Sequence, residues 1–177
     1  MKINNSVGIK GVYVYPLAEK DAAATMPAFG SDWVTIGDVL NETAEVNDDE
    51  PEVTTYTSET SNKEIIIGEN STTATLTLMD PDFEQLARYC GGSVSGDSEG
   101  KKIYTRPKAY IAKQFAIAIV PKMGAMQCCP CVTLIPALNS KVTKKGITTL
   151  KIKMKYKGDM IMKQEIVDPT TGKPYSV

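Results

Sequence analysis

The sequence TTATLTLMDPDFEQLARYCGG, residues 72–92, holds the two patterns that decide the fold. In its first part, apolar side chains and threonines alternate, so each kind occupies one face of an extended chain. This period of two predicts an antiparallel strand with one buried face, formed by Ala74, Leu76 and Leu78.

The rest of this stretch predicts one short amphipathic helix, over residues 80–91. Asp80 suits the N-cap and Pro81 the first helical position. Acidic residues follow in the first turn, where the helix dipole favours them, and a Gly-Gly pair ends the run. Such a helix can cover one face or edge of a sheet. Its apolar positions are Phe83, Leu86, Ala87 and Cys90.

Strand patterns continue on both sides. The clearest is residues 148–157, TTLKIKMKYK, where apolar residues point one way and four lysines the other. A mainly β fold follows, a β-sandwich or β-barrel of roughly eight to ten strands with one flanking helix, as a single domain over residues 1–177. Further strands are predicted over residues 8–15, 33–40, 52–60, 63–68, 108–120 and 159–167, and a tail over residues 168–177.

One segment does not suit a compact sheet. Residues 41–60, NETAEVNDDEPEVTTYTSET, are acidic, rich in threonine and almost free of large apolar residues. A structureless loop of this length is uncommon inside a compact domain. We therefore expect an extended acidic arm, a long hairpin or loop that protrudes from the body and is ordered by a partner.

Charge is divided between the two halves of the chain. Residues 1–100 hold 18 acidic and 5 basic residues, and residues 101–177 hold 3 acidic and 15 basic, although the formal net charge is only −1. Either acidic and basic strands neutralise each other within one subunit, or the acidic face of one copy binds the basic face of the next. The candidate subunit-interface residues are Glu42, Glu45, Asp48, Asp49, Glu50, Glu52, Lys151, Lys153, Lys155 and Lys157.

Other roles for these charged groups are open. The lysine face could be a solvated surface or could contact phosphates, although no aromatic residues are interleaved to stack on bases. The acidic run 48–50 could bind calcium, but it lacks the spacing of a calcium-binding loop.

Three of the four cysteines lie close together, in the stretch MQCCPCVTLIP, residues 126–136. Cys128 and Cys129 are adjacent, so on a strand they point to opposite faces and do not easily share one ion. Cys128 and Cys131 have the spacing of redox motifs, but no βαβ unit surrounds them. Buried structural thiols are the favoured interpretation; adventitious metal binding and a redox role are the alternatives.

Several functional classes lose support from the sequence. The chain has no histidine, which is the commonest general base and metal ligand. It contains no Gly-rich phosphate loop and no nucleophile elbow. No apolar run is long enough to span a membrane, and the start lacks the pattern of a secretory signal. We expect no enzymatic activity, no cofactor, no membrane anchor and no export.

The parts of the chain follow one another in a distinctive order. An early strand, GVYVYP (residues 11–16), is followed by WVTIGDVLNETAEV (33–46), which leads into the acidic arm. Next comes EIIIGENSTTATLTLMDPDFEQLARYCGG (64–92), a strand pair running into one helix, and then the lysine-alternating strand. In this order, and most specifically in residues 63–92, the chain resembles the major tail tube proteins of long-tailed phages and prophages.

The resemblance implies a structural subunit that forms hexameric rings with its own copies. In that family a sheet of each subunit lines a channel, a long loop reaches a neighbouring copy, and stacked rings conduct DNA without binding it specifically. It also implies other tail proteins as partners, synthesis in the bacterial cytoplasm and a location in the virion tail.

Three alternatives remain open at this point. One is a tube subunit of a contractile injection or secretion system, which shares this architecture. Another is a β-sandwich module that recognises a carbohydrate or a host protein, for which exposed loop aromatics are expected. The third is an enzyme that works with two converging carboxylates.

Overall fold

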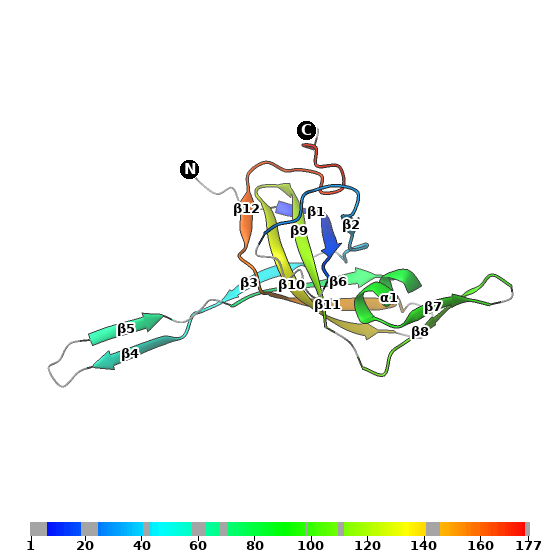
Figure 1. The fold of residues 1–177 in the computed structure, drawn as a ribbon, viewed down its shortest axis with the longest axis horizontal. Helices are drawn as coiled ribbons and strands as arrows, with labels where there is room; N and C mark the ends of the chain where they lie inside the picture. The colour runs from blue at the N-terminus through cyan, green and yellow to red at the C-terminus, as the bar shows by residue number, and fades with distance from the viewer. Residues whose placement is uncertain are drawn as a thin grey trace.

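One antiparallel eight-stranded sheet dominates the fold (Figure 1). The computed structural model describes residues 7–18, 25–40, 43–57, 63–67, 71–97, 99–109, 112–140 and 146–175. The strands follow the order β2-β1-β9-β10-β11-β6-β3, and β12 pairs with β10 on the same edge as β11. Their bounds are β1 Val7–Pro16, β2 Val34–Thr35, β3 Glu45–Asp49, β6 Ser71–Met79, β9 Lys113–Met123, β10 Met126–Asn139, β11 Thr149–Tyr156 and β12 Ile161–Lys163.

Among the described residues, two hairpins and one helix complete the fold. The hairpin of β4 (Val53–Thr57) and β5 (Lys63–Ile67) projects beyond the body at one end. At the other end lie the helix α1 (Phe83–Cys90) and the hairpin of β7 (Ser93–Gly96) and β8 (Lys102–Thr105), as Figure 1 shows.

The core lies on both faces of the central strands. On the inner face, β6 and β11 pair through the predicted apolar residues, Leu76 with Ile152 and Leu78 with Leu150. Leu86, Tyr89 and Cys90 of α1 close this cluster from one side. On the outer face, Ala116, Ala118 and Val120 of β9 contact a second cluster with Trp33 and the C-terminal segment. This double burial explains the continuous apolar run in β9.

The predicted fold class is confirmed, in that the described part of the chain is mainly β with one helix. The sheet is antiparallel and does not close into a barrel: within the described residues, no ladder joins β3 to β1 or β2. The two ends of the sheet therefore face each other across an open seam beside the inner cluster.

The predicted strand over residues 33–40 was largely wrong. Only Val34 and Thr35 pair with β1, and Gly37 then turns the chain at φ 132°. The amide of Ile36 donates a hydrogen bond to the carbonyl of Val12 in β1, whereas the amide of Leu40 donates one to the carbonyl of Thr77 in β6. This segment therefore crosses from one end of the sheet to the other and closes the seam at its helix end.

The helix begins later than predicted, and the predicted N-cap was wrong. Asp82, not Asp80, caps it: its carboxylate accepts from the Gln85 amide at 2.7 Å, and the Gln85 side chain accepts from the Asp82 amide at 3.1 Å. This reciprocal pair satisfies two amides that the helix leaves free. Asp80 instead has φ 39°, and Phe83 of the predicted apolar stripe is 42% exposed.

The C-terminal residues were predicted to be a tail, but those that the structure describes are packed on the body. Asp168 accepts hydrogen bonds from the amide and hydroxyl of Thr170, and the amide of Gly172 donates to the Asp168 carbonyl at 2.7 Å. Tyr175 then reaches β1, where its hydroxyl lies 2.9 Å from that of Tyr13. Local turn hydrogen bonds, which composition alone does not reveal, fold the segment back.

Candidate assembly surfaces

From here on the name arm is used for the β4–β5 hairpin and not for the predicted segment of residues 41–60. This hairpin exposes an aliphatic face. Val53 pairs with Ile67 and Thr55 with Ile65, so these four side chains lie on one face of the hairpin. Val53, Ile65 and Ile67 are 58%, 63% and 66% exposed. An isolated two-stranded hairpin is at best marginally stable in water, so this face is suited to burial against another surface.

The predicted acidic residues divide between the sheet and the root of the arm. Glu45, Asp48 and Asp49 belong to β3, an exposed edge strand paired with β6. Glu50 and Glu52 are exposed in the connection from β3 to β4, and Glu42 lies outside the described residues. The arm itself is completed by residues 63–67, which the sequence predicted as a separate strand.

The four predicted lysines lie together on the exposed face of β11 and just beyond it. Their strand neighbours on β6 are threonines, with Lys153 opposite Thr75 and Lys155 opposite Thr73. Within the part of the chain that the structure describes, none of Lys151, Lys153, Lys155 and Lys157 forms an ion pair.

The acidic and basic groups are thus separated on the surface. Glu45 of β3 lies in the same row as Thr75 and Lys153, two strands away from the lysine. Two inter-strand spacings put these residues about 10 Å apart, which is near the screening length at physiological salt. Within the described residues, the acidic strand β3 and the basic strand β11 therefore do not pair directly. An ion pair between the two halves of the chain does form elsewhere, between Lys102 and Glu84 at 2.6 Å.

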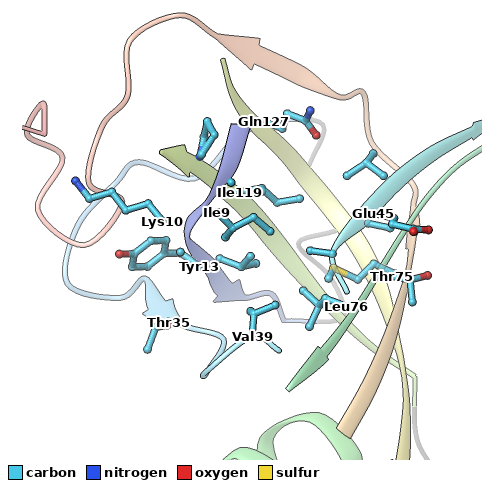
Figure 2. Close-up of a pocket in the computed structure, with 18 of the residues that line it drawn as sticks. Ile9, Lys10, Tyr13, Thr35, Val39, Glu45, Thr75, Leu76, Ile119 and Gln127 are labelled. Carbon is cyan, nitrogen blue, oxygen red and sulfur yellow. The ribbon is translucent and has the colours of Figure 1, made fainter. Parts of the chain in front are cut away.

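A cavity of about 660 Å³ opens at the seam between β1 and β3 (Figure 2). Its floor is apolar and includes Val12, Leu76 and Met154, all at most 1% exposed. Its rim carries opposite charges on its two sides, with lysines contributed by β1 and β9 and carboxylates by residues 38 and 45. Gln127 also lines it, and its buried Oε1 has no hydrogen-bond donor among the described residues.

The thiols pack as small apolar groups. Cys128 lies in the outer cluster and Cys129 in the inner one, so the adjacent pair does point to opposite faces as predicted. Burial raises the pKa of Cys128 to about 11 and also raises the pKa of Cys129 and Cys90. In the described ranges, no three potential metal ligands among cysteine, aspartate and glutamate come together. The described part of the chain also contains no helix with the length and apolar character to cross a membrane.

The sequence did not identify the two surfaces that stand out in the structure, the aliphatic arm face and the seam cavity. Ile65 and Ile67 were interpreted only as part of a strand. The apolar residues 65–67 lie close in sequence to the polar residues 53–57, with which they pair as a hairpin. This sequence feature could have predicted a hairpin with an exposed apolar face. The cavity had no signal, because it depends on how the ends of the sheet meet.

Comparisons with known proteins give remote structural likenesses only. No family model matches the sequence, and no curated protein matches it. A chain in the tail of an empty gene transfer agent particle with C6 symmetry is 12% identical, with a TM-score of 0.45 over 86% of this chain and 93% of that one.

Two further solved structures come from injection systems. A chain of the sheath–tube complex of an extracellular contractile injection system is 13% identical, with a TM-score of 0.40 over 89% of this chain and 90% of that one. A chain in the tube-terminating cap of the anti-feeding prophage is 12% identical, with a TM-score of 0.39 over 92% of this chain and 94% of that one.

Proposed function

We propose that this chain is a structural subunit of a phage or prophage tail tube, which assembles with its own copies into stacked rings around a DNA-conducting channel. The tail tube, six copies per ring and contacts with other tail proteins are proposed from the sequence resemblance, most specific in residues 63–92. The observation that carries self-assembly is the exposed aliphatic face of the arm.

Burial of that face favours a partner for every copy. Fully burying an aliphatic side chain of this size contributes about 1.5–3 kcal/mol, and three such residues lie side by side on the arm. Repetition of the contact around a ring would then provide the affinity of the assembly.

The separated charges support association between copies rather than catalysis or small-molecule chemistry. Exposed lysines on β11 and exposed carboxylates on β3 and at the arm root have no ion-pair partners within the described residues. Complementary charged surfaces chiefly set the register, the specificity and the rate of association.

The test is a pair of matched single substitutions on opposite faces of the arm. Ile67→Asp places a carboxylate on the aliphatic face, whereas Thr54→Asp places one on the other face. Losing the burial of one isoleucine predicts a critical concentration for assembly about 10- to 100-fold higher for Ile67→Asp. Thr54→Asp is expected to assemble as the unmodified chain does.

Sedimentation and electron microscopy of the purified chains give the readout. Rings or tubes from the unmodified chain, lost only in Ile67→Asp, would support the proposal. A chain that stays monomeric at millimolar concentration would refute it.

A further inference from the structure

We propose that the seam cavity is the seat for the arm of a second copy, which places the aliphatic face of that arm against the cavity floor. This inference rests on the proposed self-assembly and adds which surface of the neighbour receives the arm. The two surfaces are far apart on one chain and complementary in chemistry.

The cavity has the chemistry to take an apolar insert. The aliphatic side chains that remain open to an insert are those of partly buried Ile9, Val39 and Ile119. Beneath them lie core side chains such as Leu76 and Met154, which are at most 1% exposed. Figure 2 shows Ile9, Val39 and Ile119 around the opening between β1 and β3. A cavity of about 660 Å³ lies within the range of roughly 300–1,000 Å³ that holds a compact apolar ligand, so a few aliphatic side chains fit.

On the side of β9 the rim of the cavity complements the charge of the arm, whereas Asp38 and Glu45 lie on the other side. Lys122 lies on the side of β9 and is exposed, whereas the ammonium group of Lys10 lies 3.5 Å from the ring centroid of Tyr175 in the C-terminal segment. The root of the arm carries Glu50 and Glu52 directly before Val53. In an arm seated with Val53 over the cavity, these two carboxylates can approach Lys122.

A chain does not fill its own seat in this structure, because β3 carries the arm away from it. Glu45 at the start of β3 lines the cavity, and Val53 follows eight residues later beyond the end of that strand. At about 3.3 Å per extended residue, the aliphatic face lies roughly 25 Å from the rim. Figure 1 shows the hairpin pointing outward from the body.

The walls of the seat also offer unused hydrogen-bonding groups. Within the described residues, no strand pairs with the outer edge of β3. Gln127 offers its buried Oε1 at the cavity. Backbone donors of an inserted hairpin could satisfy such groups, as in the addition of a strand to an exposed sheet edge.

Because the arm and the seat are different surfaces of one chain, the contact is heterologous. Each copy gives one arm and receives one, so repetition produces a ring or an open filament. Two variants, each with one surface damaged, should therefore bind each other although neither binds itself.

The experiment mixes full-length chains that carry one damaged surface each. The arm variant is Ile67→Asp, which keeps the seat, and the seat variant is Ile9→Asp, which keeps the arm. One variant carries an affinity tag. The expected result is that tagged and untagged copies co-purify only when the two variants are mixed, with no binding within either variant alone.

The outcomes separate the seat from the proposed function. If the unmodified chain assembles but the mixed variants do not bind, the seat is wrong while self-assembly stands. If the unmodified chain does not assemble, both fail. Emission from the buried Trp33 reports whether each variant is folded.

A charge reversal at the rim keeps the test valid if Ile9→Asp does not fold. Lys122→Glu changes an exposed rim residue, and Lys173→Glu makes the same change in the exposed C-terminal turn. Lys122→Glu is expected to weaken association about 3- to 10-fold at low salt, and Lys173→Glu to leave it unchanged. Equal effects of the two reversals would overturn the seat.

Discussion

A β-bulge with one extra residue in β10 fixes where the cysteine side chains lie. Between Cys129 and Val132, β10 advances three positions while β9 advances only two, from Ile117 to Phe115. This β-bulge contains Pro130, which lacks the N–H that a regular ladder would need. The carbonyls of Cys131 and Gly158 accept from the Cys129 thiol at 3.2 and 3.3 Å. The thiols are thereby held in the two core clusters and in the bulge, away from solvent.

Burial of these thiols predicts low reactivity in the folded chain. With the pKa of Cys128 at about 11, this thiol stays protonated at pH 8, so a disulfide reagent should react at least 100-fold more slowly than in denaturant. The protonated thiol stabilises the fold below the pKa of the unfolded thiol, about 8.5, and this contribution is lost as pH rises through about 11. The rate of thiol labelling in the native chain, compared with the rate in denaturant, measures this protection. Fast labelling of the native chain, or protection by zinc, would contradict a structural role.

At the scale of elements, the helix start is set by competition between two aspartates. Both Asp80 and Asp82 are good N-cap residues by type. Asp82 has Gln85 three residues later and forms the reciprocal pair with it, whereas Asp80 has no such partner at position 83. Asp80 takes a left-handed conformation, and its amide donates a hydrogen bond to the carbonyl of Thr148. This bond connects the end of β6 with the residue before β11.

These two aspartates should therefore respond oppositely to substitution. Asp82→Ala removes the cap and is expected to cost about 1 kcal/mol of unfolding free energy. Asp80→Gly relieves the left-handed strain at φ 39° and is expected to be neutral or slightly stabilising. Urea denaturation of both variants measures the difference. The reverse order would show that Asp80 is the functional cap.

At the scale of the whole molecule, charge separation survives folding. The lysines of β11 and the carboxylates of β3 belong to one sheet, but the threonine row of β6 stands between them. Threonine is favoured in β-strands, and these uncharged threonines keep the lysines and the carboxylates one strand apart. The folded subunit therefore keeps basic and acidic strips that remain available to other copies.

Reversing the basic strip should block assembly without unfolding the subunit. The variant with Lys151, Lys153, Lys155 and Lys157 all changed to glutamate is expected to form no tubes. Its unfolding free energy should fall by no more than about 2 kcal/mol, since each side chain is exposed. The variant with four arginines keeps the charge and serves as the control. Electron microscopy and thermal denaturation provide the readout, and normal tubes from the glutamate variant would disprove a role for this strip.

Local patterns predicted much of the architecture. Alternation in residues 72–79 and 148–157 predicted β6 and β11 with the observed buried faces, because side-chain direction in a strand depends only on position parity. The 33–40 strand and the C-terminal tail were mispredicted because composition does not show where a chain crosses or folds back. Of the candidate interface residues, the lysines and most of the carboxylates are exposed, and their role in assembly stays a prediction.

The sequence by itself determined the mainly β class, the single helix, the alternating lysine face and the division of charge, since each is a property of neighbouring residues. Only the tertiary structure decided that the sheet stays open at a seam, that a cavity forms there, and that the arm presents bare isoleucines beyond the reach of its own core. These features depend on pairings between segments that are distant in the chain, such as β1 with β9 and β3 with β6. A local sequence pattern cannot predict such pairings, because they involve residues far apart in the sequence.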